Sequence, residues 1–447
     1  MIRRVLIANR GEIAVRVIRA CRAAGIETVA VYSEADTESM HVEQADTAVC
    51  IGPPPGRRSY LDMSSVVAAA LGTGADAIHP GYGFLAENAE FAALCASQGV
   101  IFIGPSPQAI RAVGDKIIAR ETVAKAGVPV VGGTKDAISD PSEAAEMARS
   151  IGMPVLLKAR GGGGGRGMRV VDDASGVAAA FLDASREAEA AFGDGGMYME
   201  RYLDAVKHIE IQILADQHGT VVALGERDCS TQRRHQKLIE EAPSPGLDQT
   251  IRERLCTAAV NAARSVGYFG AGTVEFLYNP KTREFFFIEM NARIQVEHPV
   301  TEMVTGVDIV KEQLTVASGG KLSIGSDVPL AGHAIECRIN AEDPSQNFMP
   351  CPGVLTRYLP PAGPGVRVDS HAYEGYCFPP NYDSLLAKLI VHGKDREESR
   401  TRMQRALNDY VIEGIKTTIP FHIAMLDHPE FRAGNITTQF VGKGMMT

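Results

Sequence analysis

The 447-residue sequence lacks the features that mark a membrane protein, a secreted protein or a nucleic-acid-coating protein. No apolar run approaches the roughly 20 residues that a membrane-spanning helix needs. Arg10 and Glu12 interrupt the apolar stretch near the N-terminus, so a signal peptide is not expected. The net charge of −9 argues against a surface that coats nucleic acid, although it leaves room for local basic pockets. We therefore expect a soluble, cytoplasmic protein.

The sequence also lacks any pair of cysteines in a C-x-x-C arrangement, and it contains no tandem repeat. Its eight cysteines are scattered, which favours reduced thiols packed mostly in cores over a structural zinc site. Hydrophobic residues make up 45% of the chain, enough for a sizeable core. The length suits about three domains.

The N-terminal part alternates apolar strands with helical patterns. Strands are predicted at 4–8, 27–32, 46–51, 75–78 and 100–103, with helices after Asn9-Arg10-Gly11 and at 60–71 and 87–97. This alternation predicts a parallel sheet with helices on its faces. Such sheets are also typical of dehydrogenases. However, Asn9–Ile13 has one glycine where a dinucleotide-binding turn needs three, which argues against that class.

A glycine run lies between two apolar, strand-like segments. The first segment is 155–160, five glycines follow at 161–165, and the second segment is 166–171. Glycine permits positive φ, so successive backbone N–H groups can close around an anion, and Lys158 adds a charge suited to phosphate. A flexible linker is the alternative. The flanking strand patterns favour a hairpin lid over a nucleotide, although neither common phosphate-binding glycine motif fits.

The middle of the chain mixes helices with paired strands, and the last part changes in composition. Helices are predicted at 115–126, 141–151, 175–191 and 250–267. Strands are predicted at 197–202, 208–214, 220–224, 272–278 and 284–291. From about 330 onward the sequence becomes rich in proline and glycine, with β-like segments and a helix at 396–408. This change predicts a third domain.

Two predicted strands carry a candidate metal site. Glu275 lies on one strand, and Glu289 and Asn291 share a face of the next, because strand side chains alternate. Two carboxylates and an amide can hold Mg²⁺ or Mn²⁺ against phosphate oxygens. An exposed acidic strand pair is the alternative. The alternation continues through Arg293, Gln295 and Glu297, where the arginine could form a plain salt bridge or an anion clamp beside a general base.

Three further features allow either a structural or a functional interpretation. The polar, basic segment 228–237 follows a predicted strand and could be a solvated loop or a site for a substrate anion. His208 could contact a ribose or lie on the surface of a strand. Lys116 opens a helix and could reach a phosphate, although most such lysines are surface residues.

Several long motifs, in the same order along the chain, resemble those of the biotin carboxylases, a family within the ATP-grasp superfamily. They are Ile7–Ala14, His79–Leu85, Lys158 with Gly161–Gly167, Glu289–Glu302 and Glu336–Glu342. The resemblance implies a mixed α/β and α+β fold in three parts. These are an N-terminal Rossmann-like (pre-ATP-grasp) domain at 1–112, an ATP-grasp domain at 113–320 with a lid at about 130–203, and a C-terminal mixed β domain at 321–447.

The resemblance also implies a role for each matching residue. ATP would be contacted by Lys116, Lys158, Gly164, Gly165, Met168, Glu200, Arg201, Tyr202, Leu203, His208, Gln232, His235, Glu275, Leu277 and Glu289. Two Mg²⁺ or Mn²⁺ ions would be held by Glu275, Glu289 and Asn291. Bicarbonate would be bound by Lys237, Arg293, Gln295 and Val296. Glu297 would deprotonate it, and Arg338, with Tyr82 nearby, would contact biotin.

The implied activity is the carboxylation of biotin, driven by ATP and bicarbonate through carboxyphosphate, on a biotin carboxyl carrier protein. This is the first half-reaction of enzymes such as acetyl-CoA carboxylase, which supplies fatty acid biosynthesis. The expected partners are a separate carrier (the sequence has no Ala-Met-Lys-Met-type segment), carboxyltransferase subunits and a second copy of the chain. The final acceptor stays open among acetyl-CoA, propionyl-CoA, pyruvate and other acceptors.

Two other functions remain as alternatives. A different ATP-grasp ligase, such as one that forms carboxyaminoimidazole, would lack Arg338 and the Glu297-His298-Pro299 segment. A non-catalytic nucleotide-binding subunit would lack a metal carboxylate or Arg293. All of these residues are present. The chain departs from the expected pattern at Arg160, Arg201 and Ala292, where a small residue, lysine, and threonine or proline are usual.

Overall fold

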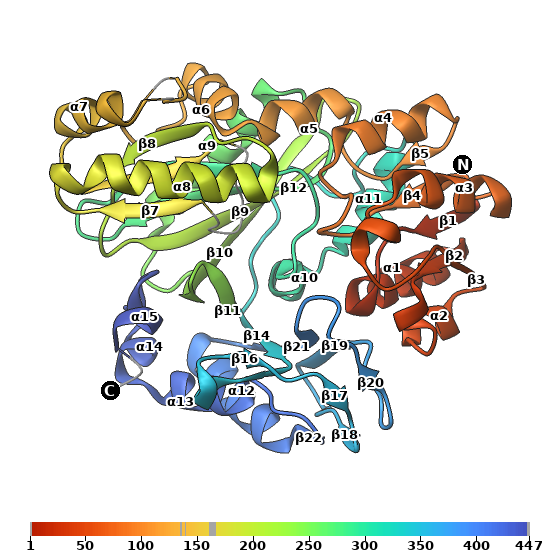
Figure 1. Cartoon of the computed structure of the whole chain (residues 1–447). Helices are drawn as coiled ribbons and strands as arrows, with labels where there is room; N and C mark the ends of the chain where they lie inside the picture. The colour runs from red at the N-terminus through yellow and green to blue at the C-terminus, as the bar shows by residue number, and fades with distance from the viewer. Residues whose placement is uncertain (1, 135, 139, 161–166, 445–447) are drawn as a thin grey trace.

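The computed structural model describes residues 2–134, 136–138, 140–160 and 167–444. The N-terminal segment forms a five-stranded parallel sheet (Figure 1). In spatial order its strands are β3 (Thr47–Cys50), β2 (Glu27–Tyr32), β1 (Arg4–Ile7), β4 (Ala77–His79) and β5 (Ile101–Phe102). Its helices are α1 (Gly11–Ala23), α2 (Met40–Gln44), α3 (Met63–Thr73) and α4 (Ala89–Ser97). The predicted parallel sheet is confirmed, and its strand order reverses between β1 and β4, where such sheets bind ligands.

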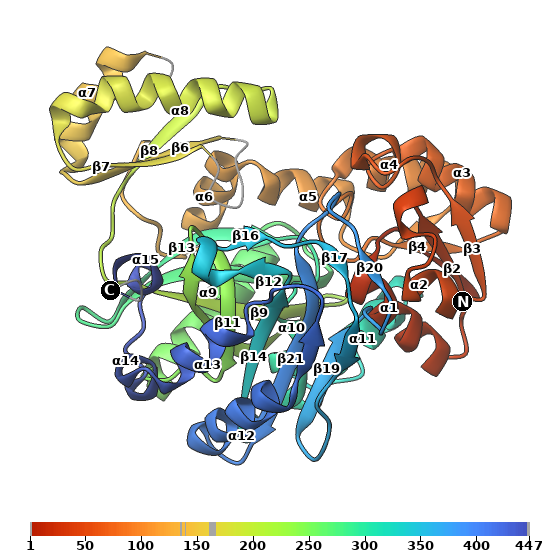
Figure 2. The same ribbon diagram turned by 60° about the horizontal axis from the view of Figure 1, so that its bottom comes forward.

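A small lid unit follows helices α5 (Pro107–Gly114) and α6 (Lys116–Lys125). Its antiparallel sheet has the order β7 (Met168–Val171), β6 (Val155–Ala159) and β8 (Met197–Arg201). Figure 2 shows α7 (Pro141–Ile151) and α8 (Val177–Phe192) on the outer side of this sheet. The predicted strands on either side of the glycine run pair as a hairpin. The glycines at 161–165 lie outside the described residues.

An eight-stranded antiparallel sheet forms the centre of the molecule. In order its strands are β13 (Glu284–Asn291), β12 (Gly270–Asn279), β9 (Lys207–Ala215), β10 (Val221–Arg233), β11 (Gln236–Ala242), β14 (His333–Asn340), β21 (Leu385–Gly393) and β19 (Val366–Ser370). Helices α9 (Gln249–Ser265), α10 (His298–Thr305) and α11 (Ile309–Ala317) also belong to this part of the chain. Three of the eight strands come from beyond residue 320, so the C-terminal part continues this sheet.

The rest of the C-terminal part consists of short strand pairs and four helices. The pairs are β15 (Glu342–Asp343) with β16 (Met349–Pro350), β17 (Gly353–Val354) with β20 (Cys377–Phe378), and β18 (Arg357–Leu359) with β22 (Val411–Glu413). The helices are α12 (Arg396–Asp409), α13 (Ile419–Asp427), α14 (Pro429–Ala433) and α15 (Phe440–Gly444). Helix α12 packs against β14 and β21, α13 packs on α12, and α15 packs against β10. Their shared core includes Ile335, Leu389 and Met403.

The structure excludes one of two alternatives and corrects one prediction. Segment 228–237 is not a solvated loop, because β10 and β11 pair through it and only Arg234 and His235 form the turn, with φ of 49° and 64°. Strand β13 ends at Asn291, so the strand alternation does not continue to Arg293, Gln295 and Glu297. The backbone leaves the sheet there and turns into α10, which Glu297 precedes directly.

All eight cysteines are free thiols, and four of them are buried: Cys21, Cys95, Cys229 and Cys337. Within the described residues, every helix falls short of the length and apolar composition that crossing a membrane requires.

Candidate active site

A cavity of about 850 Å³ lies between the lid sheet, the eight-stranded sheet and C-terminal segments. Its wall includes all of the site residues predicted from the sequence, apart from Gly164 and Gly165, which fall outside the described residues. The predicted residues on the wall are Tyr82, Lys116, Lys158, Met168, Glu200, Arg201, Tyr202, Leu203, His208, Gln232, His235, Lys237, Glu275, Leu277, Glu289, Asn291, Arg293, Gln295, Val296, Glu297 and Arg338.

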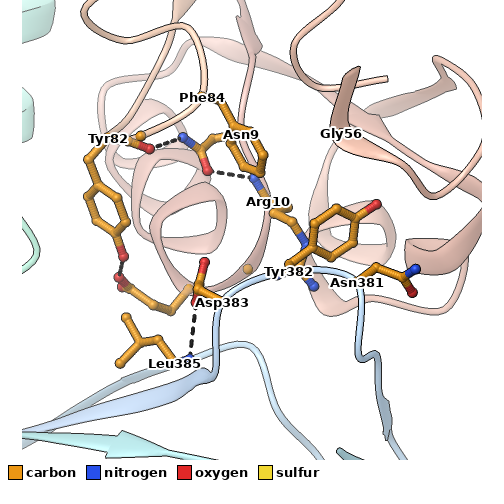
Figure 3. Close-up of a pocket in the computed structure, with 12 residues that line it drawn as sticks. Asn9, Arg10, Gly56, Tyr82, Phe84, Asn381, Tyr382, Asp383 and Leu385 are labelled. Carbon is orange, nitrogen blue, oxygen red and sulfur yellow. Dashed lines mark hydrogen bonds between the residues drawn. The ribbon is translucent and has the colours of Figure 1, made fainter. Parts of the chain in front are cut away.

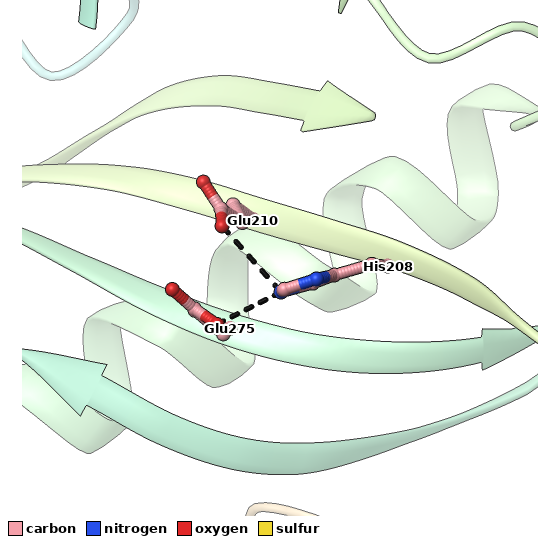
Figure 4. A group of neighbouring side chains, drawn as sticks. All are labelled: His208, Glu210 and Glu275. Atoms are coloured by element: carbon pink, nitrogen blue, oxygen red, sulfur yellow. Dashed lines mark hydrogen bonds and ion pairs between the residues drawn. The ribbon is translucent and has the colours of Figure 1, made fainter. Parts of the chain in front are cut away.

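Strand β9 supplies the floor of the cavity through a strict alternation. Ile209, Ile211 and Ile213 face the hydrophobic core, whereas His208 and Glu210 point to the opposite face. His208 Nε2 lies 2.8 Å from Glu275 Oε2 and 3.4 Å from Glu210 Oε1 (Figure 4). Burial lowers the pKa of His208, but the charge of Glu275 outweighs this effect, so the pKa lies above its usual value.

Lys237 on β11 joins three carboxylates on this floor. Its Nζ donates to Glu297 Oε1 at 2.7 Å, bonds to Glu210, and lies 3.3 Å from Glu275 Oε1. Burial raises the pKa of Glu210 to about 7. Burial also acts to raise the pKa of Glu297, but Lys237 and Arg338 outweigh it and hold the pKa well below its usual value. Glu297 is therefore an ionised carboxylate inside the protein.

Arg338 on β14 holds Glu297 from the other side. Its Nη2 donates to Glu297 Oε2 at 2.8 Å, and its Nε donates to Glu240 Oε1 at 2.6 Å. Burial acts to lower the pKa of Arg338, but Glu240 and Glu297 raise it overall. The guanidinium keeps its charge at the edge of the cavity, where it can stabilise a negative oxygen.

The segment after β13 brings more polar groups into the same space. Arg293 Nε donates to Glu87 Oε2 at 2.8 Å, and Arg293 Nη2 donates to Asn291 Oδ1 at 2.8 Å. Gln295 Nε2 donates to Glu275 Oε1 at 2.8 Å. The salt bridge considered for Arg293 exists, with Glu87 as its partner. The anion-clamp interpretation remains compatible with it, because Arg293 also lines the cavity.

Two lysines enter the cavity near the lid. Lys158 on β6 pairs with Glu200 on β8, and Lys116 Nζ lies 3.1 Å from Glu289 Oε2. Asp115 caps the helix that Lys116 opens, by accepting from two backbone N–H groups of its first turn. Both ammonium groups line the same cavity and provide positive charge that suits a polyphosphate.

Apolar side chains line another stretch of the cavity wall. They are Met168, Leu203 and Leu277, joined by Tyr202, whose hydroxyl accepts from Gln439 of the C-terminal segment. Nearby, the backbone N–H of Thr438 donates a hydrogen bond to the backbone carbonyl of Val206 at 3.0 Å. This combination can enclose a flat, mostly apolar ring.

The three departures have separate surroundings. Arg160 directly follows the lid strand β6, and its Nε lies 3.4 Å from Asp115 Oδ2 and 3.7 Å from Asp194 Oδ2. Arg201 has an exposed side chain, and its backbone N–H donates to Gly132 O at 2.9 Å. Ala292 has its side chain in the core, and its N–H donates to Glu87 Oε1 at 2.8 Å.

The sequence interpretation missed three buried residues of this cluster. Glu210 and Glu240 contact Lys237 and Arg338, and Arg227 donates to Glu210 and to Gln295. The signal for Glu210 was the alternation of polar and isoleucine residues along β9. Glu240 carried no comparable signal, because its partner is 98 residues away in the sequence.

A smaller crevice of about 280 Å³ adjoins the main cavity, and Tyr82, Asp383 and Leu385 line both (Figure 3). It lies beyond the carboxyl ends of β1 and β4, where the strand order of the parallel sheet reverses. Tyr82 therefore stands between the two spaces.

A lid sheet over a sheet that carries lysines and paired carboxylates defines an ATP-grasp enzyme. Consistent with this class, residues 115–324 match the family described as "Carbamoyl-phosphate synthase L chain, ATP binding domain". Residues 1–110 match "Biotin carboxylase, N-terminal domain" and residues 336–443 match "Biotin carboxylase C-terminal domain".

Full-length relatives agree with these matches. The chain is 57% identical over 442 residues to biotin carboxylase 1 of Bacillus subtilis, covering 99% of this chain and 98% of the relative. A biotin carboxylase-βγ-ATP complex from Campylobacter jejuni superposes with a TM-score of 0.97 at 48% identity, over 99% of each chain. A second similar structure is the biotin carboxylase domain dimer of 2-oxoglutarate carboxylase from Hydrogenobacter thermophilus, in complex with MgADP, ADP and bicarbonate. It superposes with a TM-score of 0.96 at 49% identity, and the match covers 99% of this chain and 97% of the other.

The chain belongs to the biotin carboxylases, ATP-grasp ligases that carboxylate biotin at the expense of ATP. The fold class expected from the sequence is confirmed, and both alternative functions are set aside.

Proposed function

We propose that Glu297, together with Lys237, Arg293 and Arg338, carries the chemistry of biotin carboxylation in this chain. The observation behind this assignment is the ionised Glu297 carboxylate, held at 2.7 Å by Lys237 and at 2.8 Å by Arg338 on the cavity wall. Glu297 is in the deprotonated state that a general base needs, and a bound anion that shares its two cations would offset their lowering of the Glu297 pKa.

ATP would lie along the cavity with its ends in chemically different surroundings. The adenine suits the apolar stretch formed by Met168, Leu203 and Leu277, beside Glu200, Arg201 and Tyr202. The phosphates would lie between Lys116 and Lys158, and Gly164 and Gly165 would offer them backbone N–H groups. His208, Gln232 and His235 line the wall next to these groups and would contact the ribose or the phosphates.

Divalent metal ions, Mg²⁺ or Mn²⁺, would be held by Glu275, Glu289 and Asn291. Glu275 and Glu289 occupy directly opposed positions on β12 and β13, and both line the cavity. This oxygen-rich donor set fits a hard cation, and the MgADP of the Hydrogenobacter structure supports magnesium. Such ions, when bound, neutralise charge on the phosphate oxygens.

In the first step, bicarbonate would lie against Lys237, Arg293, Gln295 and Val296, and Glu297 would accept its proton. A bicarbonate oxygen then forms a bond to the γ-phosphorus, the bridging bond to the β-phosphate breaks, and ADP leaves. The protein's contribution is positioning and charge neutralisation.

In the second step, carboxyphosphate would break down into carbon dioxide and phosphate. The phosphate takes the N1′ proton of biotin, and N1′ attacks the carbon dioxide. Arg338, with Tyr82 nearby, would stabilise the enolate-like oxygen that develops on biotin, as oxyanion donors do. The lid sheet covers this space and limits the access of water to carboxyphosphate.

Biotin would arrive on a biotin carboxyl carrier protein, and the carboxyl group would pass to a carboxyltransferase subunit. We also propose a homodimer, supported by the biotin carboxylase domain dimer of the Hydrogenobacter enzyme. The proposed location is cytoplasmic, and the final acceptor stays open among acetyl-CoA, propionyl-CoA, pyruvate and other acceptors. Similar structures named for 2-oxoglutarate carboxylase and pyruvate carboxylase support an oxo acid as one candidate.

The experiment that tests these roles separates ATP cleavage from biotin carboxylation. Glu297→Gln removes the base and keeps the shape, so both activities should fall by ~10²–10⁴. Arg338→Gln leaves Glu297 paired with Lys237, so bicarbonate-dependent ATP cleavage should survive, while carboxybiotin formation should fall by ~10²–10³. Released phosphate and labelled carboxybiotin are measured side by side on free biotin.

The matched control is Arg252→Gln, which removes another partly buried arginine bonded to a buried carboxylate, Glu226, outside the cavity. It should leave the ratio of phosphate to carboxybiotin unchanged. Parallel loss of both activities in Arg338→Gln would contradict the separation of roles, and would place Arg338 in the bicarbonate half of the site.

A further inference from the structure

Lys388 on β21 is a fully buried lysine that the reaction scheme above does not use. Its Nζ donates to the backbone carbonyl of Val296 at 2.9 Å and forms an ion pair with Glu12 Oε2 at 3.1 Å. A second carboxylate, Asp369 Oδ2, lies 3.8 Å away. Lys388 thus contacts helix α1 of the N-terminal part, the turn before α10 and strand β19 of the C-terminal part.

Glu12 extends this contact to the biotin side of the cavity. It lies in the first turn of α1 and is buried, and its Oε1 accepts from the hydroxyl of Tyr82. Tyr82 is the residue that lines both the main cavity and the crevice of Figure 3. The orientation of its hydroxyl is therefore set by Glu12, and Glu12 is held in turn by Lys388.

Val296 extends the contact to the bicarbonate side. It lies between Gln295, which donates to Glu275, and Glu297, which pairs with Lys237 and Arg338. A hydrogen bond to the Val296 carbonyl fixes this turn, and with it the direction of the neighbouring side chains. Lys388 also stands directly opposite Arg338 in the register of β14 and β21.

Burying Lys388 with two carboxylates is less favourable for stability than filling the same space with apolar side chains. A buried lysine with two carboxylates loses hydration that apolar side chains of similar volume would not need to give up. Here two of its contacts lead to residues on the cavity wall, one on each side of the reacting groups. The polar network therefore has a geometric consequence that an apolar core would not provide.

We propose that Lys388, acting with Glu12, is a positioning residue that fixes Tyr82 and the turn at 295–297 relative to each other. The proposal rests on the proposed roles of Tyr82 and Val296 at biotin and bicarbonate. With this link intact, biotin meets carbon dioxide as soon as carboxyphosphate breaks down. Without this link, carboxyphosphate still forms, but Tyr82 and the turn at 295–297 are no longer fixed relative to each other. More of the carboxyphosphate is then hydrolysed by water.

The test measures the ratio of phosphate released to biotin carboxylated, which does not depend on the fraction of folded enzyme. A misplacement of about 1 Å can cost ~10²-fold in rate, so Lys388→Met should raise this ratio about tenfold or more. Glu12→Gln keeps an acceptor for Tyr82 and loses the charge, so it should raise the ratio less. This second variant also serves if Lys388→Met does not fold.

The matched control is Arg396→Met, which removes a basic residue paired with Glu241 at 2.6 Å, away from the cavity wall. It should lower stability without changing the ratio. An unchanged ratio in both Lys388→Met and Glu12→Gln would overturn the proposal and leave the network a structural one. Failure of Glu297→Gln to reduce ATP cleavage would instead count against the roles assigned to the bicarbonate residues.

Discussion

Arg227 shows how a single buried residue organises the charged cluster. Its side chain is completely buried, and its guanidinium donates to Gln212, Thr301, Thr273, Glu210 and Gln295. It contacts Glu210, which binds Lys237, and Gln295, which binds Glu275. The positions of two carboxylates on the floor of the site therefore depend on a residue that does not line the cavity.

Replacing Arg227 with methionine should lower the free energy of unfolding by about 3–5 kcal/mol, because it leaves Glu210 without one of its buried partners. Urea denaturation followed by circular dichroism measures this loss. Arg283→Met is the control, since its pair with Asp248 is more than half exposed at the arginine and should contribute ~0–1 kcal/mol. Equal effects of the two replacements would contradict this account.

Single residues of the site could be predicted where a motif or a strand alternation exposes them. Glu289 and Asn291 follow from the period of β13, and Lys158 follows from its place at the end of an apolar strand. Glu240 could not be predicted, because only the pairing of β11 with β14 brings it to Arg338. Polar partners of this kind depend on contacts between distant segments.

At the scale of elements, a hairpin could be predicted where its turn contains residues that are typical of turns. The Pro280-Lys281-Thr282 turn marks the β12–β13 hairpin clearly. The β10–β11 hairpin turns at Arg234 and His235, which adopt positive φ without glycine or asparagine, so its sequence reads as a loop. Helices α10 and α11 are short and were also missed. Their burial against the sheet stabilises them more than their local sequence does.

The packing of three elements around the buried Glu241 carboxylate makes the stability of the protein depend on pH. Glu241 on β11 accepts from Arg396 Nε at 2.6 Å, at the start of α12, and lies 3.0 Å from His333 Nε2 at the start of β14. Burial acts to raise the pKa of Glu241, but Arg396 outweighs it and brings the pKa to about 2. The carboxylate therefore joins three elements through its charge.

Because the folded pKa is depressed, the stability from Glu241 is present above the unfolded value of 4.5 and is lost as the pH falls toward 2. Glu241→Gln should cost about 3 kcal/mol of unfolding free energy at pH 7. The difference from the parent chain should shrink below pH 4.5. Urea titrations at pH 7 and at pH 3.5 compare the two chains, and a difference that does not change with pH would point to packing instead.

At the scale of the whole molecule, the eight-stranded sheet joins regions that the sequence divides at about residue 320. The change in composition near 330 predicts a new domain, yet β14, β21 and β19 complete the sheet that β9 to β13 begin (Figure 2). Composition reports local solvent exposure and turn content, and it carries no information on which strand a new strand will pair with.

A chain that ends at residue 325 should therefore fail to stay soluble, because β11 becomes an open edge strand beside uncovered apolar residues such as Ile239. Light scattering after expression measures this aggregation. The control is the full chain cleaved once between 320 and 330, which should elute as one species with both fragments. A soluble, monomeric 1–325 fragment would contradict the prediction.

The pairing of β11 with β14 also has a consequence for the order of events during synthesis. Because synthesis runs from the N-terminus, Lys237 and Glu297 leave the ribosome well before Arg338, and Arg338 leaves it before Lys388. The nascent chain therefore carries an incomplete charge cluster until residues 338 and 388 have been synthesised. Until β14 and β21 have joined the sheet, Glu297 lacks its hydrogen bond from Arg338, and the Val296 carbonyl lacks its hydrogen bond from Lys388.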